Sequence, residues 1–434
     1  METAAAALET PIPIAQVLQW HPIKRVLFRF VFCYFVLYSW PESGRVDFLN
    51  SLPGGEPVSD WLNKPLHAIV PWIAARVFHI TGEAATYFRT GSGDTTLQYI
   101  TTLLYFVLAL AVTLVWSVLD RQRLHYVRLH FWFRILLRYT LAVTLFGYGF
   151  AKVFPQQFGP PGPFKLIEPY GEFSPMGVLW NFMGASIPYV IFSGTCEVAG
   201  GALVLFRRTT LLGALVSAAV MVNVVALNFS YDVPVKLYST HILLMAILLA
   251  APDLGRLFDF LILNRAVARA DFGGFRFAHR WMRLGAVMLK VLFLGAVLYG
   301  QISGGIQALR RQGTRPRPPL HGLYDVESFE RNGSAEWKPT TWRKVLMQAP
   351  KAIGVRTNDD TTLILNVTYD EAKSVITIDK KDSLTWSRPD GSHVLLEGSM
   401  SGTRVRISLR TIDVEKMRLK STRFHWINER GFNR

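Results

Sequence analysis

Long apolar stretches recur through the N-terminal part of the chain, separated by charged or by Pro- and Gly-rich segments. A helix needs roughly 20 residues to cross a hydrocarbon core, so the pattern predicts an all-α transmembrane helix bundle of about seven spans. The first and the sixth spans are short, and the pattern leaves their ends open. The predicted spans are residues 25–40, 97–119, 135–153, 187–206, 209–228, 237–252 and 284–302.

A different pattern fills part of the segment between the first two spans. In residues 61–81, Trp, Leu, Ile, Val and Phe recur at helical spacing, but Lys64, Arg76 and His79 interrupt the apolar face. Amphipathic helices of this kind lie in the plane of the membrane interface and do not cross the bilayer. We therefore expect an interfacial helix here.

The composition changes after Tyr299. RRQGTRPRPP at 310–319 is polar and Pro-rich, which is typical of a linker. Beyond it, apolar and polar residues alternate in short stretches such as LILNVTYD at 363–370 and RVRISLR at 404–410, with turn residues between them. This spacing predicts an all-β antiparallel barrel or sandwich, with WRKVLMQ at 342–348 as a short helix.

The run from Gly322 to Tyr324 is similar to the first-strand signature of lipocalin-like barrels, so a lipocalin-like fold is one form that the β domain would take. A barrel of this size is as readily filled by its own side chains as by a ligand.

The changes of pattern divide the chain into four parts. Residues 1–134 hold the N-terminal spans and an exoplasmic interfacial helix, and residues 135–305 hold the rest of the bundle with the last span. Residues 306–319 form the Pro-rich linker, and residues 320–434 form an exoplasmic β domain.

Charge and cysteine content narrow the class of protein. The chain has 47 Lys and Arg against 31 Asp and Glu, a net charge of +16. Nucleic-acid binding is excluded because the basic residues lie beside the apolar spans and form no separate basic face, so the lipid bilayer is the expected partner. Cys33 and Cys196 both lie inside apolar spans, which argues against a disulfide framework or a cysteine zinc site.

The basic residues also orient the predicted spans. Basic segments alternate with loops that are neutral or acidic, at 41–96, 154–186 and 229–236. Because cytoplasmic loops carry the excess of Lys and Arg, an odd number of spans with a cytoplasmic N-terminus satisfies every loop. The N-terminus does not resemble a cleaved signal peptide, so we expect the first span to stay in the membrane as an anchor.

Glu197 lies in the middle of the apolar stretch 187–206. A carboxylate at this depth costs roughly 2.5–3.5 kcal/mol on insertion scales, so it nearly always faces a partner or a cavity. Gly194, Gly200 and Gly201 flank it, and their missing side chains would let a neighbouring helix come close.

Further polar residues gather toward the same predicted side of the membrane. With Glu197 they form a candidate intramembrane cluster that contains Tyr148, Lys152, Asn223, Asn228, Asp232 and His241. The Pro- and Gly-rich segment 154–186 lies on that side too. Non-helical backbone at membrane depth survives only when protein covers it or when it lines a wet cavity.

This cluster suggests two kinds of role. Lys152 or His241 would neutralise Glu197, and the same donors would bind the carbonyls of a quinone head while a carboxylate or imidazole passes protons. The competing hypothesis is a buried polar network that only fixes helix packing, in which Asn223 serves helix–helix contact. The chain has no P-loop, GxGxxG, HExxH or GxSxG motif and no histidine pair suited to haem. No catalytic residue and no metal site is predicted, and a quinone is the one cofactor considered.

Residues 138–158 and 170–257 resemble the DoxX family of membrane proteins. The similarity lies in RY…YGFAK of the third span, in CEVAGG followed by an Arg pair, and in NFSYDVPVK before His241. The resemblance implies a compact four-helix core within the bundle, a bacterial cytoplasmic membrane, and a redox-associated role like that of the quinone-linked subunit that gave the family its name. The additional spans and the β domain depart from this pattern.

Three functions therefore remain open from the sequence. The first is a quinone-linked or redox-associated membrane subunit with a redox partner subunit or quinone. The second is a non-enzymatic binding or assembly protein whose β domain captures a lipid, a hydrophobic ligand or a protein. The third is a small-solute transporter.

The orientation can be tested with reporters fused to the C-terminus. If the N-terminus is cytoplasmic and residues 320–434 are exoplasmic, alkaline phosphatase fused there is active and green fluorescent protein fused there is dark. The reverse result contradicts the predicted orientation.

Overall fold

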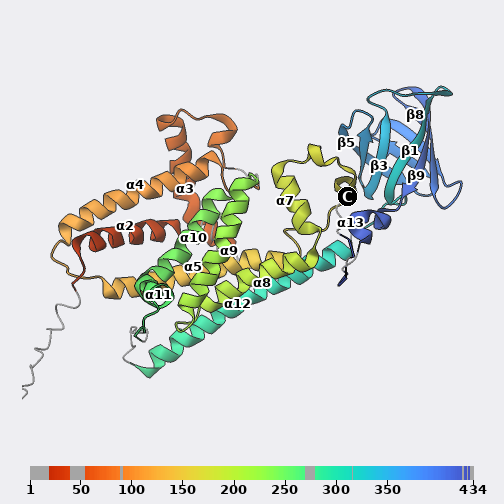
Figure 1. Cartoon of the computed structure of the whole chain (residues 1–434). Coiled ribbons are helices and arrows are strands. Elements are labelled where there is room, and N and C mark those ends of the chain that lie inside the picture. Colours follow the sequence, from red (N-terminus) through yellow and green to blue (C-terminus); the bar gives the residue numbers. More distant parts are fainter. Residues whose placement is uncertain are drawn as a thin grey trace, which may run out of the picture. The chain divides into compact units, whose positions relative to one another are not determined.

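The computed structural model describes residues 19–39, 54–87, 91–268, 279–314, 316–422, 425–427 and 429–430. The chain divides into two compact units. The first comprises Met1–Gln157 with Pro188–Ile306, and the second comprises Phe158–Ile187 with Gln307–Arg434. The first unit is helical and the second contains the strands (Figure 1).

The described part of the first unit consists of helices. They are α2 (Pro22–Tyr38), α3 (Glu56–Val77), η1 (Gly82–Ala85), α4 (Thr96–Leu119), α5 (Val127–Val153), α8 (Ile187–Val204), α9 (Thr210–Ser230), α10 (Lys236–Ala250), η3 (Ala251–Asp253), α11 (Leu254–Leu261) and α12 (Arg280–Gly313).

Among the described residues, six helical segments are long and apolar enough to cross a membrane. They are α4, α5, α8, α9, the run Lys236–Leu261 that contains α10 and α11, and α12. This confirms a helical membrane part. The helix of the first predicted span, α2, has 17 residues and is not among the six. The predicted end of that span, at residue 40, lies outside the described residues, so the count of seven stays a prediction.

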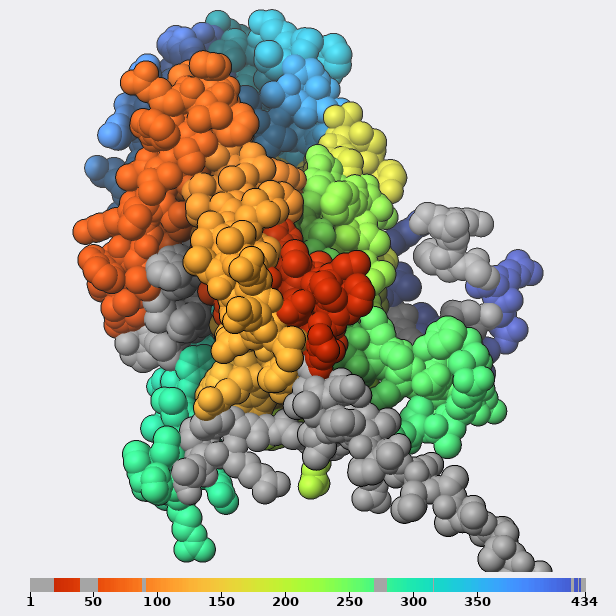
Figure 2. All heavy atoms as spheres, turned by 90° about the vertical axis from the view of Figure 1, so that its left-hand side faces the viewer, coloured from red at the N-terminus to blue at the C-terminus, as the bar shows by residue number. Residues whose placement is uncertain are grey.

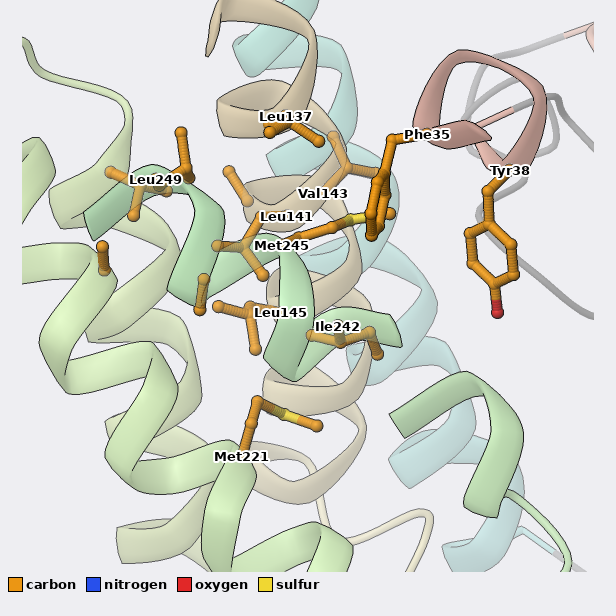
Figure 3. Packing of buried hydrophobic residues seen from close by; sticks show 14 of the residues in the cluster. Phe35, Tyr38, Leu137, Leu141, Val143, Leu145, Met221, Ile242, Met245 and Leu249 are labelled. Carbon is orange, nitrogen blue, oxygen red and sulfur yellow. The ribbon is translucent and has the colours of Figure 1, made fainter. Parts of the chain in front are cut away.

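The central helix of the first unit is α5. The buried share of its most apolar stretch is 56%, against 17% for α4 and 6% for α12. Leu137, Leu141 and Leu145 recur every four residues and therefore lie on one face of α5. There they belong to the same buried cluster as Ile242 and Met245 of α10 (Figure 3). In contrast, α4 contacts α2 and α3 and presents much of its length at the surface (Figure 2).

Arginines satisfy the last carbonyls of two helices. Arg138 of α5 is buried and donates from Nε to the carbonyl oxygen of Val204 and from Nη2 to that of Leu205, both at 2.6 Å. Arg29 of α2 donates from Nη2 to the carbonyl oxygen of Asp120, at 2.9 Å, just after α4. The last carbonyls of a helix have no partner within it, and hydrocarbon supplies no water. These contacts therefore tie α5 to α8 and α2 to α4.

The last helix is longer than predicted. It continues through Gly313, so the first half of the predicted linker at 306–319 is helical. The reason is that residues 307–311 are strong helix formers, and the first proline beyond them is Pro316.

In the described part of the second unit, strands β1 to β9 form one antiparallel sheet. Each strand of the main sheet pairs with the next one along the chain, and β1 also pairs with β9, which closes an eight-stranded barrel. The short β2 pairs only with the end of β1. The strands are β1 (Gly322–Arg331), β2 (Ser334–Ala335), β3 (Trp342–Ala349), β4 (Ala352–Thr357), β5 (Thr362–Asp370), β6 (Val375–Ile378), β7 (Asp382–Ser387), β8 (His393–Met400) and β9 (Thr403–Ile412).

The prediction of an antiparallel β domain is confirmed, in the barrel form, but the predicted helix at 342–348 is wrong. Those residues belong to β3. The pairing of β3 with β4 shifts register between Trp342 and Lys344. Because of the extra residue, the buried Trp342 and Val345 lie three positions apart. This spacing of buried residues is also typical of a helix.

The interior of the barrel is filled with side chains. Leu384, Ile407 and Leu409 have no exposed surface, and most of their neighbours in the cluster are nearly as buried. No water-sized space therefore adjoins these residues. The structure favours a packed interior over a ligand cavity at this part of the barrel.

The second unit also contains Phe158–Ile187, which is most of the Pro- and Gly-rich segment 154–186. Its helices are α6 (Pro163–Ile167), η2 (Tyr170–Glu172) and α7 (Pro175–Gly184). The ring of Phe164 occupies the space that a side chain at Gly354 of β4 would need. A glycine in the strand thus makes room for an aromatic ring from a distant segment.

We expect the barrel, residues 316–422, to fold as a separate fragment because β1 and β9 close it without help from the bundle. Within it, Leu384→Ala removes a fully buried side chain and should lower the free energy of unfolding by about 2–5 kcal/mol. Ile364→Ala is the control, since Ile364 is 76% exposed and its loss should change stability by roughly 0.5 kcal/mol or less. Urea denaturation followed by circular dichroism measures both, and a fragment without β structure contradicts this prediction.

Candidate functional site

An ion pair is buried between α5 and α8. Lys152 Nζ donates to Glu197 Oε1 at 2.9 Å and to Oε2 at 2.8 Å, so one ammonium holds both carboxylate oxygens. Lys152 is 6% exposed and Glu197 is 3% exposed. Of the two cations that the sequence left open for Glu197, the structure brings Lys152 into contact with it.

Two glycines allow the helices to come this close. A side chain at Gly194 of α8 would collide with the carbonyl oxygen of Gly149 and with Cβ of Lys152. A side chain at Gly149 would meet Val198 at 2.7 Å. On the other side of α8, a side chain at Gly200 would meet Ser217 of α9 at 2.7 Å. Glycines of α8 therefore set its distance to α5 and to α9.

Tyr148 lies one turn before Lys152 on α5 and belongs to the same cluster. Lys152 Nζ lies 5.6 Å from the centre of the Tyr148 ring, within the range of a cation–π contact. The ring of Tyr148 also lies near that of Tyr238 of α10, at 6.1 Å between centres. The charges of the pair cancel, and the glycine crossing leaves no room for a ligand between the two backbones. Its clearest role is to fix α8 against α5.

His241 belongs to a different group of residues. Its Nδ1 lies 2.7 Å from the carbonyl oxygen of Leu237 and its Nε2 lies 2.6 Å from the hydroxyl of Tyr34 on α2. A carbonyl only accepts, so in the neutral imidazole Nδ1 carries the proton and Nε2 accepts from Tyr34. The ring of Tyr38 stacks on the imidazole at 3.9 Å between centres. His241 thus joins α10 to α2.

The remaining predicted residues are spread along α9 and the turn after it. Asn228 is buried and donates to Ser239 Oγ at 3.0 Å. Asp232 has a positive φ of 51° in the turn, and its exposed carboxylate pairs with Lys236 at 2.7 Å. Asn223 is exposed on α9. The prediction that it belongs to the buried cluster is therefore wrong. Five residues separate it from Asn228, a spacing that puts the two on different faces of a helix.

Asp94 is a structural residue that the sequence did not reveal. Its Oδ2 accepts from the backbone N–H of Lys236 at 2.8 Å, and its Oδ1 accepts from that of Leu237 at 3.0 Å. Both N–H groups belong to the first turn of α10, where a carboxylate satisfies donors that have no partner in the helix and complements the helix dipole. In the sequence, the one indication of this role is Ser92-Gly-Asp94 before the second span, and these residue types are equally typical of an ordinary turn.

A second network holds the turn between α4 and α5. Arg29 Nε donates to the hydroxyl of Tyr126 at 2.8 Å, and that hydroxyl donates to Asp120 Oδ2 at 2.9 Å. This hydrogen bond is the main reason that the pKa of Asp120 lies below its usual value. Asp120 therefore stays ionised near Arg29. Among the described residues, no group of three or more His, Cys, Asp or Glu side chains is arranged to hold a metal ion.

A groove of about 790 Å³ lies beside α5 and α12. Most of its lining is apolar. We call it the α5–α12 groove and define it by Trp132, Leu136, Val143, Phe206, Leu289 and Phe293. Three cations also line it, namely Arg138, Arg207 and Lys290, and no acidic residue is among the residues around it. The sequence does not reveal this site, because basic residues beside the spans predict membrane orientation and do not indicate a common groove.

The cations of the groove are held by backbone and aromatic rings. Lys290 Nζ donates to the carbonyl oxygen of Leu205 at 2.8 Å, the same oxygen that accepts from Arg138. Lys290 also lies 4.9 Å from the centre of the Phe206 ring, and the guanidinium of Arg207 lies 5.1 Å from that of Phe131. The carbonyls at the end of α8 therefore hold two of the three cations, Arg138 and Lys290.

Removing one partner of the Lys152–Glu197 pair should be strongly destabilising. Glu197→Gln leaves a buried ammonium without a counter-charge and Lys152→Met leaves a buried carboxylate, and each should cost about 3–5 kcal/mol. The double variant Lys152→Met/Glu197→Leu should lose less than the two single variants together. Asp232→Asn is the control, because its exposed pair is worth about 0–1 kcal/mol. Denaturation of the purified protein in detergent measures all four, and an unchanged stability of Glu197→Gln contradicts the role of the pair.

Comparison with known proteins gives one informative similarity. No family model matches the chain, and no solved structure matches it significantly. The uncharacterized protein YwoB of Bacillus subtilis (strain 168) is 35% identical over 116 residues, which are 27% of this chain and 73% of YwoB. Most of this chain lies outside the match, but most of YwoB lies inside it. The chain therefore belongs to the same family as YwoB of Bacillus subtilis.

Proposed function

We propose that this protein is a membrane-embedded binding protein whose helical bundle holds an amphiphilic molecule in the α5–α12 groove. The observation that carries the proposal is the lining of the groove, which is apolar along most of its surface and includes three cationic residues and no acidic one. Its volume of about 790 Å³ lies within the range of roughly 300–1,000 Å³ that is typical of small-molecule sites.

The surroundings of the groove favour a ligand that comes from the membrane. Only 6% of the apolar stretch of α12 is buried, and Leu289 and Leu292 are 70% and 67% exposed. In a bilayer such side chains face hydrocarbon. An apolar hollow beside them takes up chains from the lipid phase more readily than solutes from water.

Neither the barrel nor the ion pair offers a comparable site. The interior of the barrel is occupied by buried side chains such as Leu384 and Ile407. Lys152 and Glu197 satisfy each other across a crossing without free space. We therefore place binding in the groove, with the ion pair as the contact that holds the bundle together.

A quinone is the second candidate, and the groove offers an observation that favours it. Tyr139, Thr140 and Lys290 are among the residues of the lining, and their side chains carry hydroxyl and ammonium groups. These groups donate hydrogen bonds that the carbonyls of a quinone head accept. With such an occupant the protein would act in the redox-associated role that the resemblance to the DoxX family implies.

The proposal is tested by filling the groove. Ala286 lies in its lining, so Ala286→Trp should displace the amphiphile that co-purifies with the wild-type protein. Leu292→Trp adds the same ring on α12 at an exposed position outside the lining and should leave the amphiphile in place. Organic extraction followed by mass spectrometry and a redox difference spectrum measures the amount of bound molecule and shows whether it is a quinone. Equal retention by both variants, or no bound amphiphile in the wild type, contradicts the proposal.

A further inference from the structure

Three cationic residues line the α5–α12 groove. Arg138 and Lys290 donate to the same oxygen, the carbonyl of Leu205, so their cationic groups lie side by side. Arg207, which follows Leu205 by two residues, lines the same groove. None of the three forms an ion pair with a carboxylate among the described residues, and none of the residues in the lining is acidic.

Backbone carbonyls hold two of these cations, but no carboxylate of the described residues neutralises them. Charged groups in a membrane protein are normally paired with one another or with backbone carbonyls. Lys152 follows that rule through Glu197. At the groove, Arg138 and Lys290 share the carbonyl oxygen of Leu205, and Arg138 also donates to that of Val204. These carbonyls offset only part of the charge because a carbonyl is a dipole and not an ion. An anion bound between the cations would relieve their mutual repulsion.

We infer that the ligand of the α5–α12 groove is a membrane lipid with an anionic phosphate head, whose chains lie along the apolar lining and whose phosphate lies against Arg207, Lys290 and Arg138. This inference rests on the proposed binding function and names the class of its ligand. Basic pockets between transmembrane helices bind lipid head groups in this way.

Phosphate suits this site better than the head of a quinone. Its several charged oxygens can accept from an ammonium and from guanidinium groups at once, and Arg is well shaped for that contact. A quinone carbonyl is neutral, so it would accept a hydrogen bond and leave all three charges without an opposing charge. The apolar residues of the same lining, among them Trp132, Leu136, Leu289 and Phe293, then receive the lipid chains.

The inference is tested by measuring which lipid the full-length protein binds in detergent micelles. Native mass spectrometry gives apparent affinities for phosphatidylglycerol, for a diacylglycerol with the same chains but no phosphate, and for a prenylated benzoquinone. Phosphatidylglycerol should bind most tightly. The double variant Arg207→Gln/Lys290→Gln keeps a donor for Leu205 but loses two charges, and its affinity for phosphatidylglycerol should fall by roughly tenfold or more.

The matched control is Arg208→Gln, which removes a charge from the neighbouring residue outside the lining and should leave the affinity unchanged. Arg138 is left intact because it caps α8. Circular dichroism and thermal unfolding verify that the variants keep the wild-type fold. If diacylglycerol or the quinone binds as tightly as phosphatidylglycerol, the inference of a phosphate head is wrong, but the binding function still stands. The same holds if Arg208→Gln lowers the affinity for phosphatidylglycerol as much as the double variant does. Absence of binding for all three probes refutes the binding function itself.

Discussion

The bundle depends on one requirement, which is that a charge taken out of water must meet an opposite charge or a hydrogen-bonding carbonyl. Glu197 meets it through Lys152, at 2.8 Å, and an unpaired carboxylate in the same place would cost several kcal/mol. The pair forms only if α5 and α8 approach closely, which Gly149 and Gly194 permit. Gly200 then lets α9 pack on the far side of α8. The positions of three helices therefore follow from one ion pair and the glycines around it.

The same requirement applies to the backbone at the ends of helices. Arg29 donates to a carbonyl just after α4, and Arg138 donates to a carbonyl at the end of α8. Asp94 accepts from the first N–H groups of α10. Each cap comes from a different part of the chain, so it satisfies a helix end and also joins two elements. The basic residues that mark one side of the predicted bundle thus serve packing as well as orientation. This is the reason why a positive charge near a span does not by itself report topology.

The sequence predicts those features that follow from local periodicity. Helical segments and strands emerge from their apolar patterns, and the position of Glu197 in the middle of a span limited its partner to Lys152 or His241. Contacts between distant segments were not predictable. Tyr34 lies 207 residues from His241, and in the sequence it is one aromatic residue of many in an apolar span. Periodicity also fails where an irregularity disturbs it, as at the register shift in β3, and polar helix formers concealed the end of α12 at Gly313.

The ion pair and the groove are connected through α5 and α8. Arg138 and Lys152 lie 14 residues apart on α5, which corresponds to roughly 20 Å along a helix. At one end, Lys152 and Gly149 fix the register of α8. At the other end, the carbonyls of Val204 and Leu205 receive Arg138 and Lys290. A shift of α8 along α5 would separate the ion pair and would also withdraw the carbonyls that hold the two cations. The buried pair therefore supports the groove from a distance, because a rigid helix transmits the position set at one end to the groups presented at the other.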